Sequence, residues 1–179
     1  MLLRLAYELK DENLTKSILF IFQPAEEGPG GAKLMIEEGL FNDYQVEALF
    51  GLHLYPDLEL GKIGLVNGPM MASSDEIIID IEGKSAHAAA PQDGMDAIYA
   101  STHLIQAYQS IVSRNLNPLD TCVITLGTIH GGEAQNILAG HVQCTGTVRA
   151  FSEDVFEIAE KRIEDINQGI EKMFNVKVR

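Results

Sequence analysis

The chain has 179 residues, of which 46% are apolar and 22% are charged, proportions typical of folded globular proteins and not of disordered chains. Its 26 acidic residues outnumber 13 basic ones, and the net charge of −13 excludes nucleic acid and anionic membrane surfaces as natural partners. The sequence has neither a signal-peptide pattern nor a run of about 18 apolar residues, so it predicts no membrane insertion and, by default, a cytoplasmic location.

Residues 1–69 alternate helical and extended patterns. Residues 1–10 have the spacing of an amphipathic helix. Residues 17–22 and 46–54 are apolar runs without polar alternation, the pattern of strands covered on both faces of a parallel sheet, and residues 30–39 between them predict a short helix. Two strands bury too little surface to offset chain entropy, so we expect an incomplete α/β domain here.

The pattern changes after a turn signal at Asn67-Gly68-Pro69. The expected elements are a strand at 76–82, a helix at 95–112, strands at 121–129 and 141–151, a helix from Ser152, and a strand at 176–178. The order β, α, β, β, α, β is the ferredoxin-like unit, which packs two helices on one face of an antiparallel sheet. The expected fold class is thus α/β and α+β, with an incomplete α/β domain over residues 1–69 and a ferredoxin-like domain over 70–179.

Both helices of the second half have one apolar stripe. The expected inward residues are Ala97, Ala100, Ser101, Leu104, Ile105, Tyr108, Ile111 and Val112 in the first helix, and Val155, Phe156, Ala159, Ile163, Ile166, Ile170 and Phe174 in the second. Cys122 and Cys144 have no metal-type spacing, so we expect them to be reduced and buried. His103 lies off the stripe and is expected to be solvated, while His130 and His141 flank a hairpin, and none of these three is assigned a role.

Two acids and one imidazole follow the predicted strands of the first half. Glu26 and Glu27 come after the first strand, and His53 lies near the end of the second. Ligands bind at this edge of open α/β sheets, and a carboxylate, an imidazole and a second carboxylate acting as base are what a hydrolytic metal site needs. Paired glutamates are usually solvated and a lone histidine is usually structural, so spacing alone leaves both interpretations open.

Four motifs occur in order along the whole chain: FQPAEEGPGGA at 22–32, GLH at 51–53, GKSAHAAAP at 83–91 and GTIHGG at 127–132. Together they resemble the metal-dependent aminoacylase and carboxypeptidase family of amidohydrolases, which contains N-acetyldiaminopimelate deacetylase, hippurate hydrolase and indole-acetyl-amino-acid hydrolases. The resemblance implies that residues 1–69 are part of a metallohydrolase catalytic domain and that residues 70–179 are its lid and dimerisation domain.

The resemblance also implies roles for single residues. Glu26 is similar to the general base, and Glu27 and His53 to metal ligands. His87 is similar to the lid histidine that reaches a neighbouring subunit's site and steadies the tetrahedral oxyanion, so a homodimer through the lid is expected.

Asn136 and Arg149 match positions that hold the substrate's acyl or carboxylate end, and the planar fork of arginine suits a carboxylate. Asn136 as a plain loop residue and Arg149 as a strand-edge charge remain open alternatives. The expected substrate is a small N-acyl amino acid, and Gln135 and Ile137 beside Asn136 favour the diaminopimelate deacetylases slightly.

The family's metal centre also uses a His-x-Cys-Gly-His-Asp segment upstream and a histidine far downstream, which this sequence lacks. We therefore expect an internal fragment of a parent enzyme that binds divalent metal ions, two in the intact parent, with zinc, manganese, cobalt or nickel all suited to carboxylate and imidazole ligands. Metal occupancy and turnover by the chain alone are expected to be low. The alternative is a catalytically incompetent fragment that retains only the lid and dimerisation fold.

Overall fold

The computed structural model describes residues 1–26 and 30–179, which divide into two compact units, Met1–Lys62 and Ile63–Arg179. The division falls shortly before the predicted boundary at residue 69, and that boundary stays a prediction. Among the described residues, no helix is long and apolar enough to cross a lipid bilayer.

The first unit has two short helices and no core of its own. Helix α1 (Leu2–Leu9) and helix α2 (Gly31–Glu37) confirm the two helical predictions for this half. Among its described residues only Gly31 is buried, whereas Phe50 is 89% exposed and Leu60 is fully exposed. Because burial of apolar surface is the main stabilising contribution to folding, this unit lacks the contacts that would hold it folded independently.

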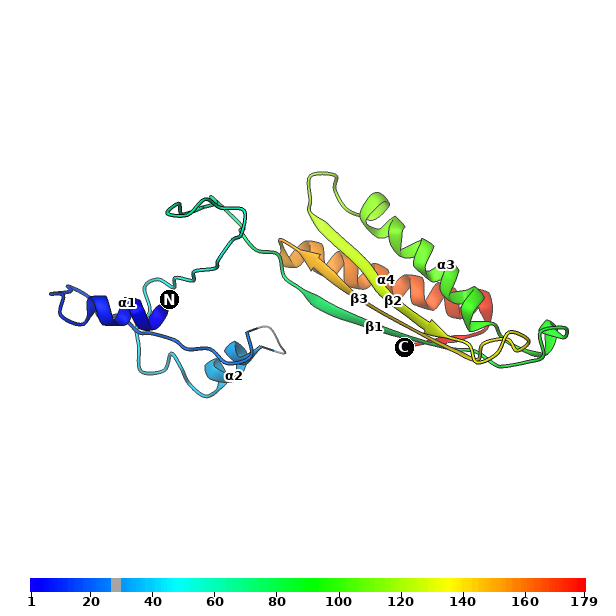
Figure 1. Ribbon diagram of the computed structural model, residues 1–179. Coiled ribbons are helices and arrows are strands. Elements are labelled where there is room, and N and C mark those ends of the chain that lie inside the picture. Colours follow the sequence, from blue (N-terminus) through cyan, green and yellow to red (C-terminus); the bar gives the residue numbers. More distant parts are fainter. Residues whose placement is uncertain (27–29) are drawn as a thin grey trace. The chain divides into compact units, whose positions relative to one another are not determined.

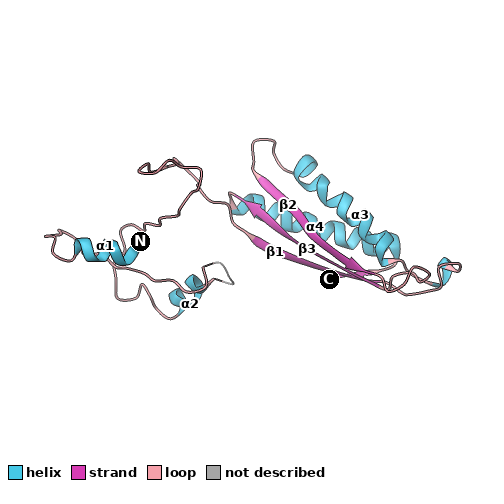
Figure 2. Ribbon diagram, viewed as in Figure 1, coloured by secondary structure: helices cyan, strands magenta, loops and turns pink. Residues whose placement is uncertain are grey.

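The two strands predicted for the first unit are not formed. Residues 17–22 and 46–54 run as irregular backbone, and Figure 2 shows no strand in this part of the described chain. A parallel strand is stabilised by ladder hydrogen bonds to its neighbours and by helices over both faces. The first unit supplies too few elements for either, so the apolar pattern alone predicted these strands wrongly.

The second unit is a four-stranded antiparallel sheet with two helices on one face (Figure 1). Its elements are β1 (Asp75–Glu82), α3 (Ala97–Ser110), β2 (Cys122–Gly131), β3 (His141–Ala150), α4 (Glu153–Phe174) and β4 (Lys177–Val178), with a 3-10 turn η1 (Pro91–Asp93) and a π turn η2 (Ile111–Asn115). The strand order is β2-β3-β1-β4, and every pair is antiparallel. The predicted element order β, α, β, β, α, β is confirmed.

Local capping explains where the two helices begin and end. The Asp96 side chain accepts a hydrogen bond from the Tyr99 N–H at 3.0 Å and so caps α3. Ser152 accepts from the Val155 N–H at 3.4 Å, which confirms it as the predicted N-cap of α4. Helix α4 ends at Asn175, whose φ of +54° lies in the left-handed region that asparagine tolerates.

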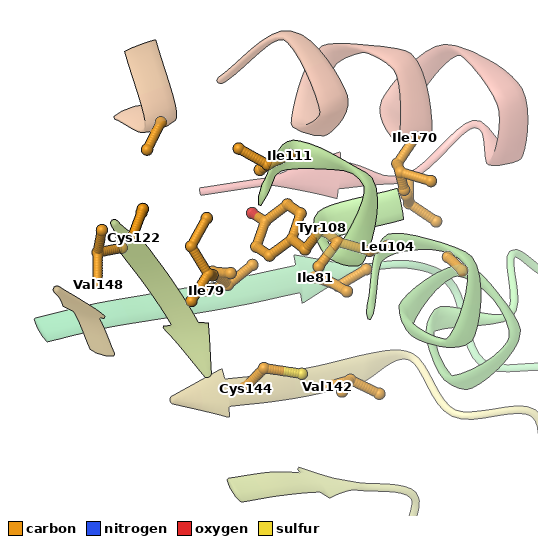
Figure 3. Packing of buried hydrophobic residues seen from close by; sticks show 14 of the residues in the cluster. Ile79, Ile81, Leu104, Tyr108, Ile111, Cys122, Val142, Cys144, Val148 and Ile170 are labelled. Carbon is orange, nitrogen blue, oxygen red and sulfur yellow. The ribbon is translucent and has the colours of Figure 1, made fainter. Parts of the chain in front are cut away.

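The core lies between the sheet and these helices, as Figure 3 shows. Its largest fully buried side chains are Tyr108, Ile79, Ile81, Leu104, Ile111, Val142 and Cys144. In strand β1 the buried Ile79 and Ile81 alternate with the exposed Ile78 and the half-buried Asp80 and Glu82, so one face of the sheet meets the helices and the other stays open. Cys122 and Cys144 are buried and unlinked, as predicted, and burial raises the pKa of both thiols.

Two details depart from the predicted stripes. Val112 is 38% exposed, because the chain widens from α3 into the π turn η2, which rotates the side chains that follow Ile111. His103 is half-buried and not solvated, since its ring packs 4.8 Å from that of Tyr99 and 4.9 Å from that of Phe174. The ring that covers His103 belongs to Phe174 of α4, and the periodicity of α3 alone could not predict that contact.

Candidate functional site

The predicted general base lies in a short loop that leads into α2. An added Cβ at Gly31 would lie 2.3 Å from the Pro24 carbonyl oxygen, so the chain folds back tightly on the first residue of the helix. Ala25 adopts a φ of +50°, unusual for a residue with a Cβ, and Glu26 follows it with an exposed side chain. Glu27, the predicted metal ligand beside it, lies outside the described residues.

His53 is exposed, and its ring orientation suits a metal ligand. Its Nδ1 lies 2.7 Å from the Leu54 carbonyl oxygen. A carbonyl oxygen only accepts, so Nδ1 bears the proton and Nε2 is left with its lone pair. Metal-binding histidines commonly donate their second ring nitrogen to a backbone carbonyl in this way.

The candidate ligands of the first unit are of the kinds that bind divalent metals, but they are too few to hold an ion. Carboxylate and imidazole ligands suit zinc and its neighbours in the periodic table. Within the described part of the chain, no group of three histidine, cysteine, aspartate or glutamate side chains is close enough to hold an ion. Catalytic zinc uses about three protein ligands. Within the described residues, Glu26 and His53 are therefore not brought together with a third ligand.

His87 and Asn136 lie side by side at one end of the second unit. An antiparallel bridge joins His87 to Ile137, and the Ala88 N–H donates to the Asn136 carbonyl oxygen at 2.9 Å. The His87 ring is exposed, and its Nδ1 accepts from the Ala89 N–H at 3.1 Å. In the neutral ring the proton therefore sits on Nε2, which leaves His87 with an outward hydrogen-bond donor.

Arg149 lies at the other end of the sheet. It pairs with Val123 on β2 and is exposed between two buried neighbours, Val148 and Ala150, so it belongs to the open face. It follows His141 by eight positions along β3, a distance of roughly 26 Å at about 3.3 Å per residue. A single chain therefore does not bring Arg149 together with His87 and Asn136.

A polar network on the open face has no counterpart in the sequence prediction. Asp80 of β1 accepts hydrogen bonds from His141 Nε2 at 2.8 Å and from Gln143 Nε2 at 3.1 Å, both on β3. These hydrogen bonds hold the pKa of the Asp80 carboxyl below its ordinary value. His141 was assigned no role from the sequence, because the only available signal was its position beside a hairpin.

The chain belongs to peptidase family M20/M25/M40, whose sequence model matches residues 1–174. The N-acetyldiaminopimelate deacetylases of Bacillus velezensis and Bacillus subtilis are 44% and 45% identical to it over 160 residues. Each match covers 89% of this chain and 43% of the relative, so the chain spans less than half the length of these curated relatives.

Solved structures show the same relationship. A protein assigned as an aminohydrolase from methicillin-resistant Staphylococcus aureus matches with a TM-score of 0.80 and 32% identity over 88% of this chain and 40% of its own. A dinuclear metal binding peptidase of the M20 family from Bacillus subtilis matches with a TM-score of 0.72 and 28% identity over 99% of this chain and 43% of its own. Both similarities are to part of a larger fold.

Proposed function

We propose that this chain is the middle portion of a metal-dependent amidohydrolase that removes the acyl group from N-acylated amino acids. The observation that supports this most strongly is its 44–45% identity, over 89% of its length, to two N-acetyldiaminopimelate deacetylases. The substrate named by those relatives is an N-acetylated amino acid with a second amino group, and we extend that class to the parent of this chain.

In this proposal Glu27 and His53 hold a divalent ion, and Glu26 takes the proton from the attacking water. The bound ion, one of two in the intact parent, would lower the pKa of that water and polarise the amide carbonyl. The Nδ1–H of His53 is donated to Leu54, which leaves Nε2 for the ion. An ion pair between Lys16 and Glu47 joins the start of the apolar segment that precedes Glu26 to the start of the segment that contains His53, which supports a shared course of the two segments.

We further propose that the second unit is the ferredoxin-like lid and dimerisation domain, spanning residues 70–179. His87 would donate its Nε2–H to the tetrahedral oxyanion, and Asn136 and Arg149 would hold the acyl or carboxylate end of the substrate. The two ends of the sheet are too far apart for one lid to assemble this set. In a homodimer whose two sheets run antiparallel, the His87 and Asn136 of one subunit would lie near the Arg149 of the other, so the two subunits together would complete the set.

Strand β2 is suited to pairing with a second copy of the chain. It has ten residues and, among the described residues, a neighbour on one side only. Val123 and Ile129 on this strand are each 50% exposed, and an unpaired apolar edge favours pairing with another chain. If β2 pairs with a second copy of itself in the antiparallel sense, the Arg149 end of one sheet meets the His141 end of the other.

Mass measurement tests the dimer. Gly127 lies in the middle of β2, and a Cβ added there meets nothing within 4 Å, so Gly127→Lys leaves the monomer fold intact. The matched control is Gly169→Lys on α4, where an added Cβ also meets nothing. We expect light scattering to report a dimer for the parent sequence and the control, and a monomer for Gly127→Lys. A monomeric parent sequence, or a dimeric Gly127→Lys, contradicts the β2 interface.

A second candidate is a catalytically incompetent fragment that retains only the lid fold. It is favoured by the first unit, in whose described residues only Gly31 is buried. Metal analysis and an amide-hydrolysis assay on the purified 179-residue chain separate the candidates for the chain itself. We expect little metal and little turnover. Stoichiometric metal with turnover would overturn the fragment interpretation.

A chimera tests the chemistry of the parent. The matched 160-residue segment of this chain replaces its counterpart in the Bacillus subtilis deacetylase. We expect the chimera to bind divalent metal and deacetylate N-acetyl amino acids. Glu26→Gln should lower kcat by about 10²- to 10⁴-fold with metal content unchanged, since it removes a general base. The control Glu157→Gln, exposed on α4, should have no effect. A folded, metal-loaded chimera without hydrolysis contradicts the proposal.

A further inference from the structure

The outer side of β1 is only partly covered by another strand. Strand β4 pairs with β1 at Ile81 and Glu82. Just beyond β4, the backbone of Arg179 exchanges two hydrogen bonds of 2.9 Å with that of Asp80. No strand of the described chain lies opposite residues 75–79 on this side, so most of β1 forms a margin of the sheet (Figure 2). A strand margin of this kind presents backbone N–H and C=O groups to a further strand.

Alternation along β1 identifies the free backbone groups. In an antiparallel sheet the backbone groups of successive residues point to opposite sides of the strand. The Asp80 groups bond outward, whereas the Ser73 N–H donates inward to a β3 carbonyl oxygen at 2.8 Å. The register between β1 and β3 is unbroken, so every even-numbered residue of β1 points outward. Glu76 and Ile78 therefore offer their N–H and C=O groups to an added strand.

The chain at β4 shows which side chains suit this margin. Lys177, Val178 and Arg179 alternate basic, apolar and basic. Lys177 lies opposite Glu82, and Arg179 Nη1 lies 3.1 Å from Glu82 Oε1 on the open face of the sheet. Val178 lies opposite the buried Ile81 on the face that the helices cover. The margin of β1 thus takes basic side chains on one face and apolar side chains on the other.

The uncovered part of β1 continues this pattern. Glu76 is exposed on the open face, and Asp75 beside it is exposed as well. On the helix-covered face Ile77 is only half-buried, although Ile79 is buried. Ile78 has an apolar side chain that is 59% exposed. A second copy of this margin is a poor occupant, because pairing would bring the same acids together.

We propose that residues 75–79 of β1 bind an extended segment of another polypeptide, which adds to the sheet in line with β4. Its residues opposite Ile77 and Ile79 are apolar, and its residue opposite Glu76 is lysine or arginine. Main-chain hydrogen bonds supply affinity in such a complex, and the cross-strand side-chain pairs supply specificity. The site lies on the edge of the sheet opposite β2, so it depends neither on the proposed dimer nor on the proposed hydrolase.

Binding of a short peptide to the full 179-residue chain tests the proposal. The probe is acetyl-Val-Tyr-Val-Lys-Thr-amide, whose Tyr faces Ile78 and whose Lys faces Glu76 in the register that continues β4. We expect saturable binding in an NMR titration. Hydrogen exchange should slow at the amides of Glu76 and Ile78, which point outward, and stay unchanged at Ile77, which faces β3.

Methylation of single peptide nitrogens separates strand addition from simple attraction of charge. The nitrogen of Tyr faces β1, so its methylation removes a hydrogen bond and should weaken binding about tenfold. The nitrogen of the second Val points away from β1, and its methylation should change binding by less than about twofold. Absence of saturable binding, or equal effects of the two methyl groups, overturns the site.

Charge reversal on the protein locates the basic contact. Glu76→Lys should weaken the probe about fivefold, and a peptide with Glu in place of Lys should restore binding to this variant. The matched control Glu157→Lys makes the same change at an exposed position of α4 and should have no effect. Equal loss in both variants, or no restoration, contradicts the site. Gly127→Lys on β2 should leave binding unchanged, and loss of binding there would place the peptide on β2 and overturn the proposal.

Discussion

The hydroxyl of Tyr108 should hold the two helices of the second unit together. Tyr108 is fully buried in the core (Figure 3). Its hydroxyl donates to Asn167 Oδ1 at 2.6 Å, which joins α3 to α4. Burial raises the pKa of Tyr108 far above its ordinary value, so the group stays a protonated donor throughout the neutral range. Tyr108→Phe keeps the ring in place and removes this one bond.

We expect Tyr108→Phe to lower the free energy of unfolding by about 1–2 kcal/mol. A net hydrogen bond contributes about 1 kcal/mol, and the Asn167 oxygen left in a partly buried place adds a further desolvation cost. The corresponding fall in Tm is roughly 4–16 °C, at about 4–8 °C per kcal/mol for a domain near 100 residues. Urea unfolding followed by circular dichroism measures the change, with an unaltered slope showing that the unfolded state is the same.

A double-mutant cycle with Asn167→Ala isolates the pair. The coupling energy should be about 1 kcal/mol, because the two side chains contact each other directly. The control is Tyr99→Phe, whose ring is 56% exposed and whose loss of hydroxyl should change stability by less than about 0.5 kcal/mol. A zero coupling energy, or a Tyr108→Phe variant as stable as the parent sequence, refutes the idea that this bond joins the helices.

Three further outcomes follow from the packing and the charges. Leu104→Ala opens a cavity at a fully buried position and should cost about 3–5 kcal/mol in urea unfolding. Gly83→Ala places a methyl group 2.1 Å from the Met95 carbonyl oxygen and should cost about 1–3 kcal/mol in the same assay. The pKa of the Asp80 carboxyl is lowered in the folded state. Its hydrogen bond with His141 therefore adds stability above the ordinary carboxyl pKa of 3.8. This stability is lost as the pH falls through the lowered pKa. Asp80→Asn should flatten that part of an acid-unfolding curve, and an unchanged curve contradicts the assignment.

Local pattern was sufficient to predict most of the second unit. The stripe of α3 through Leu104 and Tyr108 and the cap at Ser152 depend on neighbours three or four positions away, so periodicity and capping rules reveal them. The same reasoning was wrong for residues 17–22 and 46–54, because an apolar run becomes a strand only when other strands pair with it.

For the candidate site residues, too, the sequence predicted their identities but not their positions in space. Glu26, Glu27, His53 and His87 lie within the quoted motifs, which are local strings, whereas Asn136 and Arg149 were inferred from family positions outside them. The sequence does not show how they are separated in space. His87 pairs with Ile137, the neighbour of Asn136, whereas Arg149 lies at the far end of β3. Only the strand order and register give that distance, and the distance supports the proposal of a second subunit.

By itself the sequence determined which segments form helices and strands in the second unit, most of the side chains that those elements bury, and which family motifs the chain contains. Tertiary structure decided that Asp80 faces His141 and Gln143, more than sixty positions further along the chain. The physical reason is register. Alternation along β1 and β3 predicts the face on which each side chain lies, but a slip of two residues between the strands would keep those faces and still move Asp80 away from His141 and Gln143.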